Sequence, residues 1–341
     1  MQNICYVKLF FVSAIFALIL CLLNGGKNIY AGEQKYYRLG VDLGGTNIKV
    51  GLIDEQGNFI GEKCKCKTNA DRDYKLILKD MADCCHKILN DNKIKIEQVK
   101  GIGIGIPGKC DAKKKVIIYA CNIKSLNGIN IEQELQKFIN LPVYIDNDAN
   151  CAAIGESKFG VSKGYKNSIM ITLGTGIGGG IIINNEILPN AEIGHHIINL
   201  AGENCSCGRK GCWEAYASAT GLIHEAKIYA QKNPDSKLNS IDKDKINGKF
   251  VFDMANAGDQ TAILVVNNYI DYLAEGIANL INIFDPEIFV IGGGISNQGE
   301  SLLIKVRESV RKKVYANDLE SKIIKSKLGD DAGIIGAASL A

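Results

Sequence analysis

Apolar and polar residues alternate with two different periods in the first half of the chain. Residues 37–66, YRLGVDLGGTNIKVGLIDEQGNFIGEKCKC, contain three strand-like runs separated by the turns GGT and EQGN, which predicts a meander of three strands. Residues 74–89 instead place apolar side chains at positions i, i+3 and i+4, the pattern of a helix with one buried face. The apolar run at 99–106 predicts a buried strand that ends in a glycine-rich loop. The remaining elements of this half are a short helix, a strand and a helix, at 131–138, 142–146 and 150–160.

The second half restarts with the same kind of elements. Residues 167–188 read as strand, glycine-rich turn and strand, as DLGGTNIKV does in the first half. Helices are expected at 214–231 and 261–284, a buried strand at 287–294, and a last helix from Ala332. We therefore predict an α/β fold of two duplicated lobes whose glycine-rich turns face a cleft between them.

An apolar extension precedes these elements. Residues 9–23, LFFVSAIFALILCLL, are shorter than the ~20 residues of a transmembrane helix. Three interpretations stay open, namely a signal peptide, a membrane tether or a misassigned start, and the segment is excluded from the fold. The predicted organisation is an extension at 1–36, an N-terminal lobe at 37–150 and a C-terminal lobe at 151–341, with the last helix returning to the N-terminal lobe.

Composition narrows the class of protein. Hydrophobic residues at 46% and charged residues at 23% of 341 positions are ordinary for a globular protein. The net charge of +3, with Lys and Arg scattered, does not indicate a nucleic-acid partner. Among the 12 cysteines, Cys84 and Cys85 fall on the apolar face of the predicted helix, and Cys64 and Cys66 alternate with lysine. We interpret these four as core residues.

Three glycine-rich turns each follow an apolar strand, at DLGGTNIK, GTGIGGG and IGGGIS. Glycine lets backbone N–H groups approach phosphate oxygens, and a carboxylate such as Asp42 suits Mg²⁺. None is a Walker A loop, and GIGIPG at 103–108 matches a dinucleotide fingerprint only formally, because Pro107 stands where a helix should open. Together the turns indicate a nucleotide-binding cleft. The candidate residues for ATP and Mg²⁺ are Asp42, Gly44, Gly45, Thr46, Lys49, Gly174, Thr175, Gly176, Gly293 and Gly294.

Two polar stretches carry candidate chemistry. Asp146, Asn147 and Asp148 come between a strand and a helix, where one of them would serve as N-cap and a carboxylate beside the cleft could act as a general base in phosphoryl transfer. The stretch EIGHHIINLAGENCSCGRKGCWE at 192–214 crowds two His, three Cys and three Glu together. Taken alone, this stretch is a zinc site, a redox cluster or a set of catalytic residues.

In combination, these motifs resemble the ROK family (repressors, open reading frames and sugar kinases) of the actin/hexokinase-like ATPase fold. The resemblance runs from Leu39 to the end of the chain and is carried by DLGGTNIK, IGIGIPG, DNDANCAAIGE, LGTGIGGGI, EIGH, CSCGRKGCWEAYAS, INIFDPEIFVIGGG and LGDDAGIIGAA. CGRKGCWEAYASATGLI and NLINIFDPEIFVIGGG look most like the bacterial glucokinases of the family.

The resemblance implies roles for individual residues. It makes Asp148 the catalytic base, and it implies sugar contacts by Gly108, Asn122, Asn147, Asp148, Glu192, His195 and Glu214. It also implies a structural zinc ion held by His195, Cys205, Cys207 and Cys212, with the other nitrogen of the His195 ring serving the sugar. A disulfide within this cysteine trio is a weaker alternative, because an odd number of thiols in a reducing compartment pairs badly.

The implied activity is ATP-dependent phosphorylation of the primary hydroxyl of glucose to glucose 6-phosphate. Two departures from the family pattern are expected to fall near the sugar pocket and put the substrate in question. The segment before EIGH is short and has Ala191 where the family usually has glycine, and Leu126 stands where an aromatic residue often follows the sugar-loop Asn122. The alternatives are a kinase for N-acetylmannosamine, fructose or allose, and a non-catalytic sugar-sensing protein. A repressor would need a DNA-binding motif before Leu39, where the residues are largely apolar.

The implied chemistry also predicts a location and partners. ATP and reduced zinc thiolates belong in the cytoplasm, so we expect a cytoplasmic catalytic body, with membrane contact limited to residues 9–23. The expected partners are the sugar and ATP, and no nucleic acid. The resemblance implies a homo-oligomer, either a dimer or a tetramer.

Overall fold

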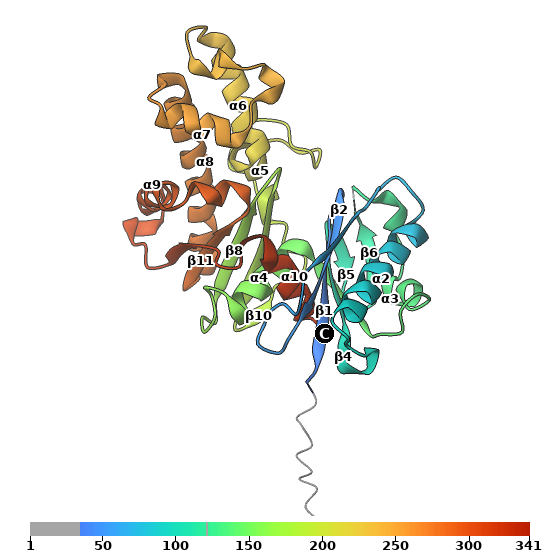
Figure 1. The fold of residues 1–341 in the computed structure, drawn as a ribbon. Helices are drawn as coiled ribbons and strands as arrows, with labels where there is room; N and C mark the ends of the chain where they lie inside the picture. Colours follow the sequence, from blue (N-terminus) through green and yellow to red (C-terminus); the bar gives the residue numbers. More distant parts are fainter. Residues whose placement is uncertain (1–34, 121) are drawn as a thin grey trace, which may run out of the picture. The chain divides into compact units, whose positions relative to one another are not determined.

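Residues 35–120 and 122–341 are described by the structure, a computed structural model (Figure 1). The first of two large sheets has the strand order β3-β2-β1-β4-β7. Strands β1, β2 and β3 form the predicted antiparallel meander, and β4 and β7 continue the sheet parallel to β1. The strands span Tyr37–Leu43 (β1), Asn47–Ile53 (β2), Cys64–Lys67 (β3), Val99–Ile106 (β4) and Val143–Asn147 (β7).

The second large sheet repeats this order as β10-β9-β8-β11-β12. Again the first strand pairs antiparallel with the second, and two parallel strands follow on its other side. The duplication predicted from element order is therefore confirmed at the level of topology. The strands span Ser168–Leu173 (β8), Ile177–Ile183 (β9), Glu186–Ile187 (β10), Ile288–Gly292 (β11) and Lys322–Lys325 (β12).

Nine α-helices complete the described part of the chain. They span Tyr74–Asp91 (α2), Ile131–Leu135 (α3), Asp148–Phe159 (α4), Trp213–Ala217 (α5), Ala219–Lys232 (α6), Gly248–Asn256 (α7), Gln260–Phe284 (α8), Glu300–Arg311 (α9) and Ala332–Ala338 (α10). Helix α2 follows the predicted pattern, since Ile77, Met81, Cys84 and Cys85 all lie on its buried face. Each fully buried apolar side chain of this kind contributes roughly 1.5–3 kcal/mol.

The expected single helix at 214–231 is wrong, because the structure divides it into α5 and α6. Ser218 has extended backbone angles, φ −84° and ψ 169°, and its hydroxyl accepts from the Gly221 N–H to begin α6. The N–H of the next residue, Ala219, donates to the Gly174 carbonyl at 2.9 Å, outside the helix. A tertiary hydrogen bond thus overrides a continuous apolar pattern.

Helices α4 and α10 lie side by side between the two large sheets (Figure 1). Glycines make this approach close enough for backbone contact. A methyl group at Gly40 in β1 would lie 2.0 Å from the Ile334 carbonyl oxygen, and one at Gly336 would lie 1.6 Å from that of Cys151 in α4. The last helix of the chain therefore packs directly on the first strand.

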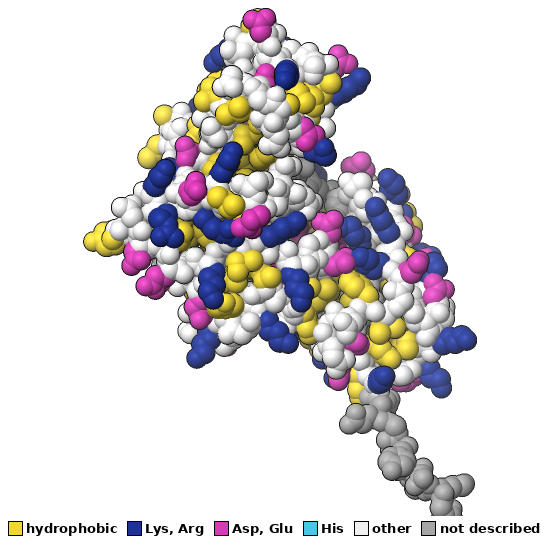
Figure 2. Space-filling model, turned by 60° about the vertical axis from the view of Figure 1, so that its left-hand side comes forward, with side chains coloured by type: hydrophobic (Ala, Val, Ile, Leu, Met, Phe, Trp, Pro, Cys, Tyr) yellow, Lys and Arg dark blue, Asp and Glu magenta, His cyan; other side chains and the backbone are white. Residues whose placement is uncertain are grey.

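Two further observations concern the surface and the extension. On the face shown in Figure 2, Lys and Arg side chains lie among Asp and Glu side chains and do not gather in one block. Of the helices in 35–120 and 122–341, none combines the length and apolar character needed to cross a membrane. The apolar run at 9–23 lies outside the described residues.

Candidate active site

A cleft of about 720 Å³ collects residues from both large sheets and their connecting loops. It brings together most of the residues predicted to contact the sugar and most of those predicted to bind phosphate in the second and third glycine turns. Its lining is Pro107, Gly108, Lys109, Tyr119, Asn122, Asn147, Asp148, Thr172, Gly174, Thr175, Gly176, Ile177, Gly178, Glu192, His195, Glu214 and Gly293. Residues separated by more than 180 positions in the sequence thus share one cavity.

The first glycine turn, between β1 and β2, does not itself line this cleft but borders a residue that does. A methyl group at Gly45 would lie 3.1 Å from the Asn122 Cβ. Asp42 is the penultimate residue of β1, and its carboxylate forms an ion pair with Lys49 Nζ at 3.1 Å. The predicted residues outside the cleft lining are Asp42, Gly44, Gly45, Thr46, Lys49 and Gly294.

Asp148 is the first residue of α4 and directly follows strand β7, so its carboxylate lies at the carboxyl end of the sheet. Burial, together with the smaller effects of the negative charges of Asp42 and Glu192, raises the pKa of Asp148 to about 6. A carboxylate with this pKa is ionised at neutral pH and is a better proton acceptor than an ordinary Asp. It can act as a general base in the cleft.

The two residues before Asp148 have different jobs. Asn147 is the N-cap of α4, because its Oδ1 accepts from the N–H groups of Ala149 and Asn150, and its Nδ2 donates to the Gly108 carbonyl at 3.0 Å. Asp146 accepts from the Asn150 amide at 2.8 Å, and burial raises its pKa. Asn147 keeps one amide proton for a ligand in the cleft, whereas Asp146 holds the start of the helix.

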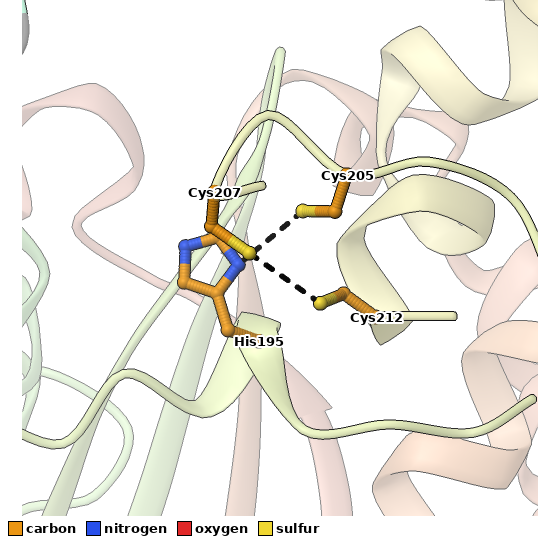
Figure 3. A group of neighbouring side chains, drawn as sticks. All are labelled: His195, Cys205, Cys207 and Cys212. Carbon is orange, nitrogen blue, oxygen red and sulfur yellow. Dashed lines mark hydrogen bonds between the residues drawn. The ribbon is translucent and has the colours of Figure 1, made fainter. Parts of the chain in front are cut away.

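The predicted metal ligands form a compact group (Figure 3). One ligand atom from each of His195, Cys205, Cys207 and Cys212 lies within 4.8 Å of all the others. Cys205 Sγ lies 3.5 Å from His195 Nδ1, Cys207 Sγ lies 3.6 Å from Cys212 Sγ, and all three cysteines are free thiols. Three thiols and one imidazole in this arrangement fit a tetrahedral zinc ion.

A tight turn in the chain presents these thiols. The Cys205 N–H donates to the Arg209 carbonyl at 2.8 Å, and Asn204 bridges to Lys210. Gly208 and Gly211 have φ of 86° and 75°, a left-handed conformation that favours glycine. The spacing C-x-C-G-R-K-G-C therefore folds two cysteines onto the tip of the turn and returns the third to its base.

Glu214 connects this cysteine loop to the second glycine turn. Its Oε2 accepts from the Ile177 N–H at 2.9 Å, and its Oε1 accepts from the Ser206 hydroxyl at 3.2 Å. A methyl group at Gly176 would lie 2.3 Å from Oε2, so a larger residue there would displace the carboxylate. One side chain therefore spans the predicted sugar side and the predicted phosphate side of the cleft.

Several cleft residues were missed from the sequence. Lys109 and Tyr119 are paired in a separate hairpin formed by β5 (Lys109–Asp111) and β6 (Val116–Tyr119). The alternation in KCDAKKKVIIY signals this hairpin, although it lacks the glycine turn of a typical one. The other missed lining residues are Pro107, which directly follows β4, and Thr172, Ile177 and Gly178, which belong to the strands that flank the second glycine turn.

Neither departure from the family pattern lines the cleft. Leu126 is fully buried in the core of the first sheet, and Ala191 packs against the core of the second. Both changes lie near residues predicted for the sugar, since Ala191 precedes Glu192 and Leu126 lies four residues after Asn122, and their effect on the substrate stays a prediction. They alter the packing behind the loops that carry Asn122 and Glu192.

Comparison with known proteins places the chain in a family. The model of the ROK family matches residues 38–341. The chain is 38% identical to a glucokinase of Halalkalibacterium halodurans over 320 residues, covering 90% of this chain and 95% of the relative. It is 32% identical to a xylose repressor of Caldicellulosiruptor bescii over 310 residues, covering 89% of this chain and 77% of the repressor.

A solved structure gives the same assignment. The chain is similar to a ROK family glucokinase from Streptomyces griseus in complex with glucose and AMPPNP, with a TM-score of 0.77, 34% identity, and coverage of 89% of this chain and 99% of that chain. The predicted actin/hexokinase-like α/β fold is confirmed by this likeness and by the duplicated sheet order. The protein belongs to the ROK family.

Proposed function

We propose that the protein is an ATP-dependent sugar kinase that transfers a phosphoryl group to the primary hydroxyl of glucose, forming glucose 6-phosphate. One observation carries the proposal, namely that a half-buried carboxylate of raised pKa, Asp148, shares one cleft with Glu192, His195 and Glu214 and with two glycine-rich turns. The similar glucokinases from H. halodurans and S. griseus support the activity and the sugar.

Asp148 acts as the base in this mechanism. With a pKa of about 6 its carboxylate is ionised at pH 7, and it accepts the proton of the attacking sugar hydroxyl as that oxygen bonds to the γ-phosphorus of ATP and the bond from this phosphorus to the bridging oxygen breaks, releasing ADP. Asn147 donates its remaining amide hydrogen to a sugar hydroxyl while its oxygen stays fixed as the cap of α4. The base is thereby carried on a rigid helix start.

The glycine turns bind the nucleotide phosphates through backbone N–H groups. Thr175 and Gly176 present this surface within the cleft, and Gly44–Thr46 presents it from the first sheet. Asp42, paired with Lys49, is the carboxylate best placed to hold Mg²⁺, which when bound neutralises charge on the phosphates. These residues position the phosphates and leave the proton transfer to Asp148.

The proposed zinc ion has a structural role. His195, Cys205, Cys207 and Cys212 would hold it, and the ion would fix the loop that carries His195. His195 directs Nδ1 at Cys205 and also lines the cleft, so Nε2 is the nitrogen available to a sugar hydroxyl. A cytoplasmic location and a dimeric or tetrameric assembly are further proposals.

The test is ATP-dependent phosphorylation across a panel of hexoses, using the full chain and a chain that starts at Tyr37. We expect glucose to have the highest kcat/KM, with Asp148→Asn as the inactive control. Turnover of N-acetylmannosamine, fructose or allose in place of glucose would keep the mechanism and overturn the substrate. Folded, zinc-loaded protein that phosphorylates none of these sugars would overturn the kinase and favour a sugar sensor.

A further inference from the structure

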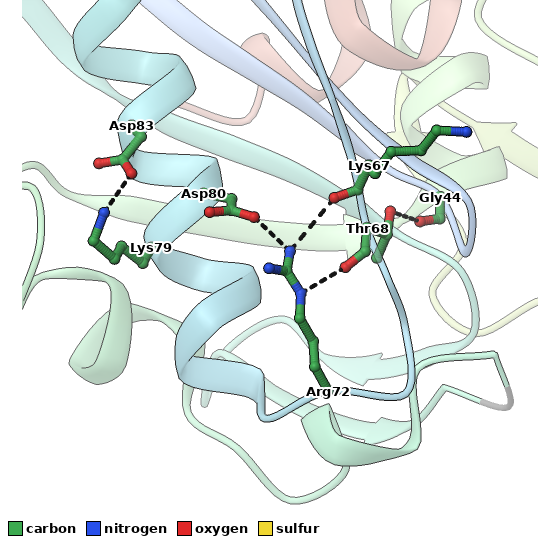
Figure 4. Close-up of polar contacts among 7 residues, drawn as sticks. All are labelled: Gly44, Lys67, Thr68, Arg72, Lys79, Asp80 and Asp83. Atoms are coloured by element: carbon green, nitrogen blue, oxygen red, sulfur yellow. Dashed lines mark hydrogen bonds and ion pairs between the residues drawn. The ribbon is translucent and has the colours of Figure 1, made fainter.

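The glycine turn Gly44–Thr46 is held from behind by Thr68, the residue that follows strand β3 (Figure 4). The Thr68 hydroxyl donates to the Gly44 carbonyl at 2.6 Å, and the Thr68 N–H donates to the Thr46 carbonyl at 3.0 Å. The Thr68 residue is fully buried. One residue therefore fixes two of the three carbonyls of the turn, those of Gly44 and Thr46.

Thr68 is itself held by a charged side chain. Arg72 Nε donates to the Thr68 carbonyl at 3.1 Å, and its terminal nitrogen donates to the Lys67 carbonyl at 3.4 Å. The same guanidinium pairs with Asp80 of helix α2 at 2.5 Å. Figure 4 shows these contacts as one chain from α2 through Arg72 and Thr68 to Gly44.

This arrangement sets the direction of the backbone N–H groups. In a trans peptide the carbonyl and the N–H of the same unit point in opposite directions. When the Gly44 carbonyl points at Thr68, the Gly45 N–H points away from Thr68. Gly45 is also the residue whose missing side chain faces Asn122 of the cleft. Within residues 35–120 and 122–341, no acceptor is found for the N–H groups of Gly45 and Thr46.

The turn does not need Thr68 merely to close. The Gly44 N–H already donates to the Asn47 carbonyl at 3.0 Å, and β1 and β2 pair on both sides of it. The additional bonds from Thr68 fix the orientation of a turn that is already formed. Precise orientation of backbone donors is what binding of phosphate oxygens requires.

We propose that Thr68 is a positioning residue that aligns the Gly44–Thr46 turn with the phosphates of the nucleotide, and that the Arg72–Asp80 pair supports it. The proposal rests on the proposed kinase function and deepens it on the ATP side. It assigns a role to the connection between β3 and α2, which contributes no residue to the cleft lining.

The first experiment compares Thr68→Val with Thr68→Ser in the full chain. Valine keeps the shape of threonine but removes the hydroxyl, whereas serine restores the donor. For Thr68→Val we expect kcat/KM for ATP to fall about tenfold and KM for glucose to stay within twofold, with Thr68→Ser close to wild type. A purely structural role would lower the melting temperature of Thr68→Val and leave the KM for ATP of the folded protein unchanged.

The second experiment tests the support of Thr68. Arg72→Gln removes the ion pair with Asp80 and shortens the reach to Thr68, so we expect a smaller loss in the same direction, about threefold in kcat/KM for ATP. Asp83→Asn is the matched control, because Asp83 forms an exposed ion pair with Lys79 on the same helix and contacts no residue of the turn (Figure 4). This control is expected to match wild type.

The outcomes separate this inference from the proposed function. A wild-type protein that phosphorylates no sugar overturns the proposed function. An active wild type whose Thr68→Val variant keeps its KM and kcat for ATP overturns the role of Thr68. Equal losses for ATP and glucose would also contradict it, since positioning of the phosphate turn predicts an effect on the nucleotide side.

Discussion

The two sheets repeat one strand order, but their glycine turns are held by different means. The turn between β1 and β2 is held by Thr68, the residue that follows the neighbouring strand β3. The turn between β8 and β9 is held by α5 and α6, since Glu214 accepts from the Ile177 N–H and Thr220 donates to the Thr175 carbonyl at 2.7 Å. The groups that bond directly to the first turn are neutral, whereas the second turn is held by a carboxylate as well as by a hydroxyl.

This difference shows how a duplicated scaffold divides its work. Glu214 also accepts from Ser206 of the cysteine loop, so the second turn and the predicted sugar loop are mechanically linked. The first turn has no contact of this kind with the cysteine loop among its hydrogen bonds within the described residues. We therefore expect damage to the cysteine loop to spread to the second turn and to spare the first.

The largest effect is expected at Asp148, because the proposed general base is needed whichever of the two glycine turns is altered. Asp148→Asn should lower kcat by about 10³-fold, because it removes the general base and keeps the size of the side chain. The pKa of this carboxyl is raised from 3.8 to about 6, so ionised Asp148 destabilises the fold as pH rises through that window. The variant should therefore melt no lower than wild type at pH 7. A kcat within tenfold of wild type would remove Asp148 from the role of base.

The second largest effect is expected when the zinc ion is lost, and it should disturb the second glycine turn more than the first. Cys212→Ser should lose bound zinc and raise KM for glucose about tenfold or more, because the loop that carries His195 is released. KM for ATP should rise less. Metal content and both KM values are the measurements, and Cys66→Ser on the edge strand is the control for loss of a thiol. Full activity without bound metal would contradict the structural role of zinc.

Glycine substitutions compare the turns directly. A methyl group at Gly176 meets Glu214 Oε2 at 2.3 Å, whereas one at Gly44 meets the Asn47 carbonyl oxygen at 3.1 Å. Gly176→Ala should lower kcat/KM for glucose by about tenfold and Gly44→Ala by about threefold or less, since only the first displaces a side chain of the cleft. Equal effects of the two substitutions would argue against a special link through Glu214.

The smallest effect is a shift in the pH profile. We expect kcat/KM for glucose to be half-maximal near pH 6 and to fall below it, because protonated Asp148 cannot accept a proton. The charges of Asp42 and Glu192 both raise this pKa, so Asp42→Asn and Glu192→Gln should each move the midpoint to lower pH. A midpoint that moves upward in either variant would contradict the assignment of the profile to Asp148.

Local patterns in the sequence predict much of this structure. The meander, helix α2 and the second strand–turn–strand unit follow from short-range periodicity, and the structure shows them. Helix α7 and the break at Ser218 were not predicted, because the break depends on a hydrogen bond from Ala219 to Gly174, more than forty residues earlier. Sequence patterns carry no record of such distant acceptors.

In the cleft, too, local sequence patterns predict some residues, whereas others depend on contacts between distant parts of the chain. Residues next to glycine turns or in the EIGH motif could be picked from the sequence, and the structure brings most of them together. Their individual roles stay predictions. Thr68 carried no signal, since a single threonine after a short strand looks like any polar residue at a strand end. Its importance appears only when Gly44 and Arg72 are seen on either side of it.

The close packing of α10 has a consequence for the order of synthesis. This helix comprises Ala332–Ala338 and follows every strand of both large sheets in the sequence, yet it packs on β1, the first strand of the first sheet. The first sheet therefore emerges from the ribosome long before the helix that covers Gly40 and Gly103 exists. Native closure of the first lobe must wait until α10 has been synthesised, so a nascent chain stalled before Ala332 should keep this face open to chaperones.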